Sequence, residues 1–298
     1  MSIQKSLRLS LVLMACLPLI FLTIFTYNLS YKKYMDLATQ STVELAKNYG
    51  MGFQSQLNSQ IAEVEGLANG TNIQNLVLEN YNGVTLGNDS PYYTNVTDLF
   101  ATASDYAGNN VNYYLYDVNG YYITSSDNTN TDDWQEHMAI PVEDITETKI
   151  LQCSPLDEIE SIDVVSPIII KSQIVGLIRA DITSRYFGSF IPEDGSAFIM
   201  TNDGGYLFTS TGLTGQRELE TQAFNCLNGA DNAKDYGHLK ASSFKNIYGF
   251  CKLSDSNWLY LIKQQGTQYQ QILATLPITM SITLIIILMI AIWVSRIL

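Results

Sequence analysis

Five tyrosines crowd one short stretch of this 298-residue sequence: Tyr113, Tyr114, Tyr116, Tyr121 and Tyr122. A tyrosine combines a large apolar ring with a hydroxyl group, which suits the orientation of a small polar ligand. Side chains alternate along a β-strand, so Tyr114 and Tyr116 share one face while Tyr113 and Leu115 share the other. The face with Tyr114 and Tyr116 is either the wall of a ligand pocket or part of the core, and both interpretations stay open.

Two other side chains near this stretch are candidates for binding. Trp134 follows the polar segment SSDNTNTDD, where an isolated tryptophan is either a lid over a pocket or an anchor for the loop. Asp181 ends an apolar strand, where a carboxylate is costly unless it is paired or solvated. The polar segment also has oxygen donors for a cation, but it lacks the glycine and the distal glutamate of an EF-hand loop. We therefore expect a solvated acidic loop and no metal.

Motifs for catalysis are missing. His137 and His238 are the only histidines, and neither lies in a zinc-binding or catalytic-triad motif. The four cysteines have no spacing that matches a zinc site. Cys226 and Cys251 either pair in an oxidising compartment or remain buried free thiols. We expect neither enzymatic activity nor a cofactor in these residues.

The charges divide the chain into three parts. Two apolar runs flank a central region, residues 28–275, which carries all 29 acids and 13 of the 16 basic residues, a net charge of −16. We expect no binding of nucleic acid, because such binding depends on phosphate contacts from Lys and Arg. The second run, Leu276–Val294, has nineteen residues. As a helix it reaches about 28 Å, enough to cross a hydrocarbon core of roughly 30 Å.

The first apolar run, Leu9–Phe25, is longer than that of a signal peptide, and no A-x-A-like cleavage site follows it. We therefore expect an uncleaved transmembrane helix. Lys5 and Arg8 before this run and Arg296 after the second place both termini in the cytoplasm by the positive-inside rule, although Lys32-Lys33 weaken the assignment. The sequence thus predicts a multi-pass protein of the plasma membrane whose central region is extracytoplasmic.

A long amphipathic helix is predicted after the first span. Apolar residues recur at spacings of three, four and seven over residues 30–68, and no proline interrupts them. These residues are Tyr34, Ala38, Leu45, Tyr49, Phe53, Leu57, Ile61, Val64 and Leu67. A helix of about 57 Å is too long for a compact domain of this size, so we expect a spine that runs away from the membrane. The opposite face is rich in Gln, Asn and Ser, and we expect a homodimer along the spine.

A pattern of β-strands follows a polar segment of loops and short helices, Thr71–Asn110, and the strand pattern occurs twice. Strands at 111–116 and 121–125 flank a hairpin turn with Asn119-Gly120. At an offset of 84 residues, strands at 197–201 and 206–210 flank Asp203-Gly204. Each hairpin precedes two more apolar strands, at 162–170 and 173–182 in the first copy and at 244–253 and 258–263 in the second. The shared order of four strands predicts two copies of one α+β module.

Two apolar spans, a long helix after the first and two successive hairpin-plus-strand modules resemble the double Cache (PAS-like) sensor domain of bacterial transmembrane receptors. The stretch Asp163–Ile182, DVVSPIIIKSQIVGLIRADI, resembles the paired strands of that family, with Ser166-Pro167 in the first strand and Gly176 and Asp181 in the second. Over residues 28–298 the resemblance implies an α+β fold. A long N-terminal helix would carry two PAS-like antiparallel-sheet modules, flanked by two transmembrane helices.

The resemblance implies a ligand pocket in the membrane-distal module and, after residue 298, an output region: a histidine kinase, diguanylate cyclase or chemoreceptor. In amino-acid-binding members, an aspartate that matches Asp181 holds the ligand amine, and an arginine two residues before the tryptophan holds its carboxylate. Here that second position is Asp132, which would repel a carboxylate. An amine such as a polyamine suits the local acids better. These acids are Asp127, Asp132, Asp133, Asp163 and Asp181.

The sequence thus predicts the ligand-sensing region of a transmembrane receptor. The expected parts are a cytoplasmic N-terminus (1–8), a transmembrane helix (9–29), the spine (30–68), a membrane-distal module (69–185), a membrane-proximal module (186–270) and a second transmembrane helix (272–296). The expected ligand-binding residues are Tyr114, Tyr116, Tyr122, Trp134, Asp163 and Asp181, and the ligand is an amine or is amino-acid-like. The alternative is a membrane-anchored structural or interaction protein whose distal module is packed solid.

Overall fold

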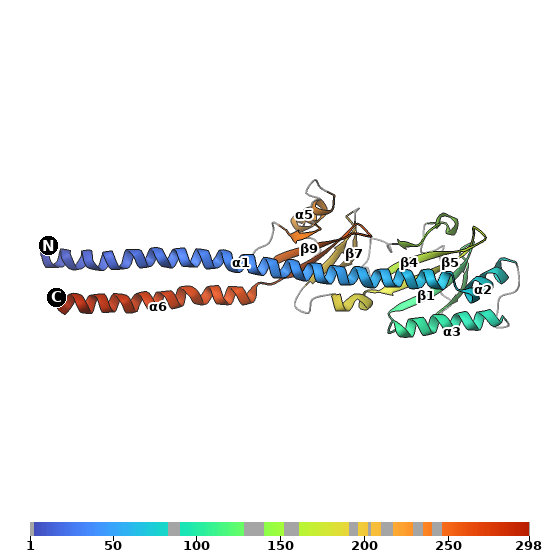
Figure 1. The fold of residues 1–298 in the computed structure, drawn as a ribbon, viewed down its shortest axis with the longest axis horizontal. Helices are drawn as coiled ribbons and strands as arrows, with labels where there is room; N and C mark the ends of the chain where they lie inside the picture. Colours follow the sequence, from blue (N-terminus) through green and yellow to red (C-terminus); the bar gives the residue numbers. More distant parts are fainter. Residues whose placement is uncertain are drawn as a thin grey trace.

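Two long helices leave a body of two β-sheets and run side by side as a narrow arm in the computed structural model (Figure 1). Helix α1 runs from Ile3 to Ala68, and α6 runs from Thr267 to Ile297. Both chain ends lie at the far end of the arm. The structure describes residues 3–82, 90–127, 140–151, 161–190, 196–201, 204–209, 217–228, 235–239 and 246–297.

Helix α1 continues without a break from the first apolar run into the predicted spine, with Pro18 inside it. Its 66 residues reach about 100 Å. The apolar stripe found in the sequence faces the sheets, since Ala38, Phe53, Leu57 and Val64 are buried. Both sheets pack against this part of α1, so the predicted long helix that carries both modules is confirmed.

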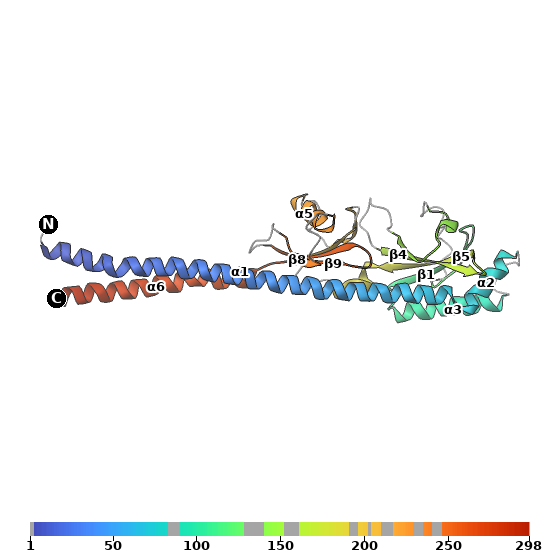
Figure 2. The same ribbon diagram turned by 45° about the horizontal axis from the view of Figure 1, so that its top comes forward.

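The two sheets follow one another along α1, as both views show (Figures 1 and 2). Their strand orders are β2-β1-β5-β4-β3 and β7-β6-β10-β9-β8. The sheet farther from the arm is called the distal sheet and the other the proximal sheet. The distal sheet has β1 (Val111–Asp117), β2 (Tyr122–Ser125), β3 (Lys149–Leu151), β4 (Ser161–Ile170) and β5 (Gln173–Thr183). The proximal sheet has β6 (Ser196–Met200), β7 (Tyr206–Thr209), β8 (Tyr236–His238), β9 (Ile247–Leu253) and β10 (Trp258–Gln264). Each sheet contains the four predicted strands and one edge strand, β3 or β8, that the sequence pattern missed.

The internal repeat extends to the local geometry of the hairpins. The ladder has a bulge after Leu115 in the first copy and after Ile199 in the second. Gly120 and Gly204 take the same turn position, with φ of 83° and 86°, in the left-handed region that favours glycine. The offset of 84 residues relates both pairs. The predicted duplication of one α+β module is therefore confirmed.

Residues 71–110 contain more helix than the sequence pattern suggested. They form α2 (Thr71–Tyr81) and α3 (Pro91–Tyr106). Ser90 caps α3 by accepting a hydrogen bond from the Tyr92 amide, and Pro91 takes the first helical position, where its missing N–H costs nothing. Both helices join α1 on one side of the distal sheet and bury Ile73 and Phe100 there. Helix α5 (Arg217–Asn228) and the 3₁₀-helices η1 (Val142–Asp144) and η2 (Ser184–Phe190) complete the described elements.

Two glycines in α1 let other elements approach the helix backbone closely. A Cβ atom on Gly50 would lie 3.0 Å from the Cβ of Cys251, and one on Gly52 would lie 2.4 Å from the ring of Phe190. These glycines weaken an isolated helix, but here they provide contact surfaces. No disulfide joins Cys226 to Cys251, and of the two only Cys251 is buried as expected, since Cys226 is half-buried. Burial raises the pKa of the Cys251 thiol.

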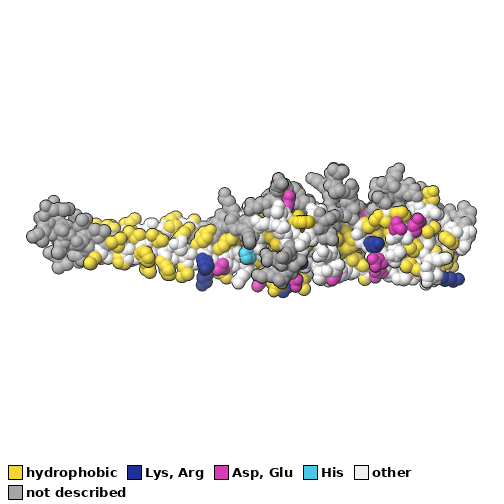
Figure 3. Space-filling view, turned by 90° about the horizontal axis from the view of Figure 1, so that it is seen from above, with side chains coloured by type: hydrophobic (Ala, Val, Ile, Leu, Met, Phe, Trp, Pro, Cys, Tyr) yellow, Lys and Arg dark blue, Asp and Glu magenta, His cyan; other side chains and the backbone are white. Residues whose placement is uncertain are grey.

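In the part of the arm that is coloured in Figure 3, the side chains are hydrophobic or uncharged, and charged side chains first gather where the arm meets the body. Exposed large apolar residues follow both helices, including Phe21, Phe25, Ile285 and Trp293. Over the stretches that the structure describes, no helix is both long enough and apolar enough to cross a membrane.

Candidate ligand-binding site

The distal sheet has two chemically different faces. Tyr113 and Leu115 belong to the large core that the sheet forms with α1, α2 and α3. Tyr114 and Tyr116 belong to a separate cluster on the other face, which includes Val165 from β4. The predicted division of the tyrosines between the two faces is confirmed. The face that carries Tyr114 is called the outer face from here on.

Strand register brings polar side chains of three strands together on the outer face. Tyr114 of β1 lies opposite Arg179 of β5. In the next row, Asp181 of β5 lies between Asn112 of β1 and Asp163 of β4. Residues two apart on a strand share a face, so Arg179 and Asp181 both belong to the face of Tyr114.

Arg179 and Asp163 form a buried ion pair at the centre of this face. The Nε of Arg179 lies 2.9 Å from Oδ1 of Asp163, and the two side chains are only 9% and 1% exposed. The guanidinium group also lies over the ring of Tyr114, 5.2 Å from its centroid, in cation–π geometry. The arginine is therefore held between a carboxylate and an aromatic ring, which fixes the orientation of its guanidinium group.

A hydrogen-bonded chain runs along the β2 edge of the outer face. The Tyr122 hydroxyl lies 2.8 Å from Oγ of Ser125, which donates to Oδ1 of Asp127 at 2.7 Å. Because Ser125 donates its one hydroxyl proton to Asp127, the Tyr122 hydroxyl is the donor to Ser125. Burial raises the pKa of Tyr122. The Tyr116 ring meets that of Tyr122 edge-on, with centroids 6.5 Å apart. This edge thus joins an aromatic wall to a carboxylate.

Five of the six predicted site residues lie on the outer face; Trp134, with Asp132 and Asp133, lies outside the described residues. Sequence reasoning missed Arg179. The signal was present, because an arginine in the apolar strand two residues before Asp181 carries the same burial cost that drew attention to Asp181. Among the residues that the structure describes, no group of acidic, His or Cys side chains is placed to hold a metal ion.

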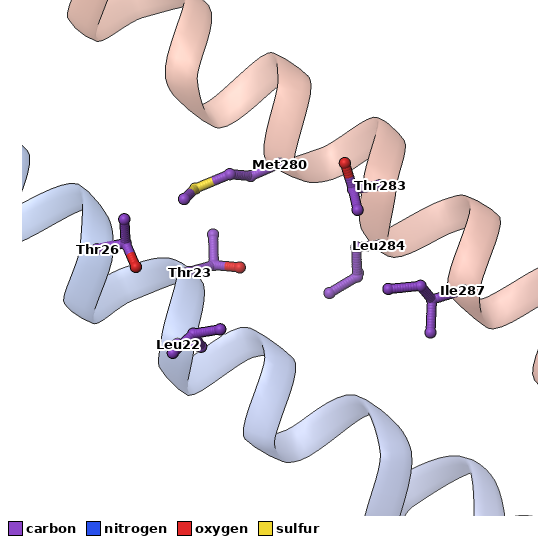
Figure 4. Close-up of a pocket in the computed structure, with 7 residues that line it drawn as sticks. All are labelled: Leu22, Thr23, Thr26, Met280, Thr283, Leu284 and Ile287. Carbon is purple, nitrogen blue, oxygen red and sulfur yellow. The ribbon is translucent and has the colours of Figure 1, made fainter.

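Three hollows lie away from the outer face. One of about 920 Å³ lies between α1 and β8, and one of about 550 Å³ lies between α1, the end of α3 and Tyr186. A third, of about 160 Å³, separates α1 from α6 in the arm, where Thr23 and Thr26 lie across from Met280 and Leu284 (Figure 4). The lining of these three hollows includes no predicted site residue.

Comparison with known proteins finds the fold but no sequence family. No family model matches the chain, and no curated protein does. The sensor domain of the histidine kinase DctB from V. cholerae matches with a TM-score of 0.51 at 10% identity, over 79% of this chain and 98% of that domain. The ligand-binding domain of the chemoreceptor CtaA from Pseudomonas fluorescens, solved with L-isoleucine, matches with a TM-score of 0.52 at 15% identity, over 83% of this chain and 98% of that domain.

The chain therefore has the fold of the sensor domains of bacterial histidine kinases and chemoreceptors. The predicted double Cache architecture, with a long N-terminal helix and two antiparallel-sheet modules, is confirmed at the level of the fold.

Proposed function

We propose that this protein is the extracytoplasmic ligand-sensing region of a transmembrane signalling receptor. The observation that carries the proposal is the buried Asp163–Arg179 pair on the outer face of the distal sheet. The proximal sheet repeats the same register, with Phe198 opposite Leu261 where the distal sheet has Tyr114 opposite Arg179.

Folding of this module does not require the charges. The equivalent face of the proximal sheet packs Phe198, Tyr248 and Leu261 into an apolar cluster beneath α5. Desolvation offsets most of the Coulomb attraction of a buried ion pair, so an apolar replacement is often as stable. The register places Leu261 at the position of Arg179 and Tyr248 at that of Asp163, so the proximal copy has no ion pair there. A buried pair that only one copy has supports a binding role in the distal module.

The charges favour a ligand with both a carboxylate and an amine over a polyamine. Arg179 neutralises Asp163, one of the acids on which the polyamine hypothesis depends. An arginine presents forked N–H donors that match a carboxylate, and Asp181 in the neighbouring row offers an acceptor for an ammonium group. The complex of CtaA with L-isoleucine supports this class of ligand. The proposed ligand is therefore amino-acid-like, with Tyr114, Tyr116, Tyr122 and Trp134 as apolar wall.

Isothermal titration of the full chain in lipid nanodiscs tests the proposal with four probes: L-isoleucine, isoleucinol without the carboxylate, 3-methylvaleric acid without the amine, and putrescine. We expect binding of the amino acid only, reduced at least tenfold by Arg179→Lys and by Asp181→Asn. The exposed Lys171→Arg is the matched control. Binding of putrescine alone would reject the amino-acid class and keep the sensor. A screen of all twenty amino acids, amines and carboxylic acids that gives no heat would favour the structural alternative.

The arm is proposed to cross the plasma membrane, with the sheets outside the cytoplasm. An arm in water would leave a contiguous apolar surface exposed, which soluble proteins rarely do. The proposed spans are residues 9–29 and 272–296, and the proposed output is a cytoplasmic histidine kinase, diguanylate cyclase or chemoreceptor region. Protease protection of the arm in inverted vesicles, with digestion of the sheets only in right-side-out vesicles, tests this orientation.

A homodimer along the spine is also proposed. The side of α1 away from the sheets exposes Leu37 and Met51 among polar residues. Crosslinking of Met51→Cys in membranes, with Ala38→Cys on the buried side as control, tests it; equal crosslinking of both would contradict a dimer through this side.

A further inference from the structure

We propose that η2 couples the distal module to α6 through a latch on the spine, formed by Gln60 with Tyr186 and by Gly52 with Phe190. Strand β5, which carries Arg179, ends at Thr183, and η2 begins at the next residue. The chain itself therefore links β5 directly to η2, which precedes the first strand of the proximal module.

A buried glutamine holds the first half of the latch. Gln60 of α1 is 4% exposed, and its Nε2 donates to the Tyr186 hydroxyl at 2.7 Å. Its Oε1 accepts a hydrogen bond of 3.3 Å from the hydroxyl of Tyr113, the neighbour of Tyr114 on β1. Gln56, one turn earlier, donates to the Tyr186 carbonyl at 3.3 Å. Buried polar networks of this kind specify one arrangement, because an unmade bond inside the core is costly.

The second half of the latch is the packing of the Phe190 ring against the backbone of α1 at Gly52. Phe190 packs on Gly52 so closely that any side chain there would displace it. Phe187 packs on Phe53, with ring centroids 4.4 Å apart. The end of η2 is thereby pressed against α1 at one defined level.

The latch connects to the exit helix through β10. The Tyr260 hydroxyl donates to the carbonyl of Phe190. Strand β10 ends at Gln264 and α6 begins at Thr267, so two residues separate them. The Gln264 side chain also accepts a hydrogen bond of 2.9 Å from Thr42 of α1. The route from the outer face to α6 thus passes β5, η2, Tyr260 and β10, with each step a covalent or hydrogen-bonded contact.

A chain of contacts transmits a signal only if one element in it has two arrangements, and if both the ligand site and α6 shift the balance between them. The structure shows one arrangement, with Tyr186 bonded to Gln60 and Phe190 packed on Gly52. The proposal adds a second, in which η2 is released from α1. Occupancy of the outer face changes the fraction of closed latches. The trigger depends on the proposed ligand-sensing function, but the link between η2 and α6 does not, so the two are tested separately.

Hydrogen exchange of the full chain in nanodiscs, read by mass spectrometry without ligand, tests the link. Tyr186→Phe removes only the latch hydroxyl, and its matched control is Tyr106→Phe, at a side chain 89% exposed. Gly52→Ala displaces Phe190, and its matched control is Gly66→Ala on the same helix, where an added Cβ meets nothing within 4 Å. Tyr186→Phe should raise exchange about fivefold in η2, β10 and the first turn of α6, the factor given by ~1 kcal/mol for one hydrogen bond. Gly52→Ala should raise exchange in the same three segments. Strands β1 and β4 should keep their rates.

Three results would overturn the link: faster exchange confined to η2, a uniform rise across both sheets, or the same rise in the controls. Should Gly52→Ala not fold, Tyr186→Phe decides alone. The two proposals can fail separately. If both variants raise exchange in η2, β10 and α6 but the wild type binds no ligand, the sensor function is rejected and the link between η2 and α6 is kept.

Discussion

The distal and proximal sheets are one scaffold filled in two ways. Both sheets have the same strand order, and their hairpin bulges and turn glycines are related by an offset of 84 residues. On the outer face, however, the distal sheet buries the Asp163–Arg179 pair, whereas the proximal sheet buries Leu261 and Phe198 beneath α5. The same strand pairing therefore forms with an ion pair or with an apolar cluster on this face. The fold of the module does not depend on which of the two is present.

On the faces toward α1, the two sheets are linked to η2 by different tyrosines. Each sheet buries one tyrosine whose hydroxyl reaches toward η2: Tyr113 through Gln60 in the distal sheet, and Tyr260 through the Phe190 carbonyl in the proximal sheet. The repeat offset places Ala197 at the position of Tyr113, so the two tyrosines are not copies of each other. They meet at η2 because that element lies between the modules.

The largest expected effect comes from removing half of the ion pair. Arg179→Leu leaves the carboxylate of Asp163 buried without its cation, so the free energy of unfolding should fall by ~3–5 kcal/mol. Urea denaturation at neutral pH measures it. Arg185→Leu, at an exposed arginine, should change stability by less than ~0.5 kcal/mol. A loss below ~1 kcal/mol for Arg179→Leu would mean that the pair is solvated in solution.

Converting the distal face toward the proximal one should restore that stability. The double variant Arg179→Leu, Asp163→Leu removes both charges and replaces them with hydrocarbon, and we expect it to recover the ~3–5 kcal/mol lost in the single variant. It should not bind L-isoleucine in calorimetry. Retained binding would show that the pair is structural and that the ligand site lies elsewhere.

The reciprocal change tests the apolar face. Leu261→Ala removes a fully buried side chain from the proximal cluster, so it should cost ~2–5 kcal/mol of unfolding free energy through lost burial and the cavity left behind. Ligand affinity, measured well below the new melting temperature, should stay within twofold. Ile285→Ala, exposed on α6, is the control. A parallel loss of affinity would place the ligand site between the modules.

Sequence reasoning identified the parts whose signal is periodic or repeated. The stripe ending in Val64 and Leu67 and the four-strand order are such signals, and the structure has both. It missed β3 and β8, which have three residues each and therefore no readable alternation. It also treated Asp163 as a ligand for an amine, because the partner Arg179 is 16 residues away and only strand register brings the two together. Long-range pairing of charges carries no local pattern.

The smallest expected effect is on how the free energy of unfolding falls at alkaline pH, where buried and exposed tyrosines contribute differently. Burial raises the pKa of Tyr113, with a further contribution from the nearby charge of Glu63, and burial likewise raises the pKa of Tyr260. In the unfolded chain both titrate near 10. Their contribution to stability is thus fully present below pH ~10 and is lost progressively above it, by up to ~1.4 kcal/mol per pH unit for each group.

Urea denaturation between pH 9.5 and 11 measures this slope. Phenylalanine cannot ionise, so Tyr113→Phe should make the decline shallower, whereas Tyr121→Phe, at a side chain 61% exposed, should leave it unchanged. The Cys251 thiol, whose pKa is also raised by burial, adds the same background slope to every variant. Equal slopes for wild type and Tyr113→Phe would mean that the hydroxyl reaches water, and the bond to Gln60 would then no longer tie β1 to the latch. The difference between the two slopes therefore shows whether the Tyr113 hydroxyl stays buried on the inner face of the distal sheet, where it donates to Gln60.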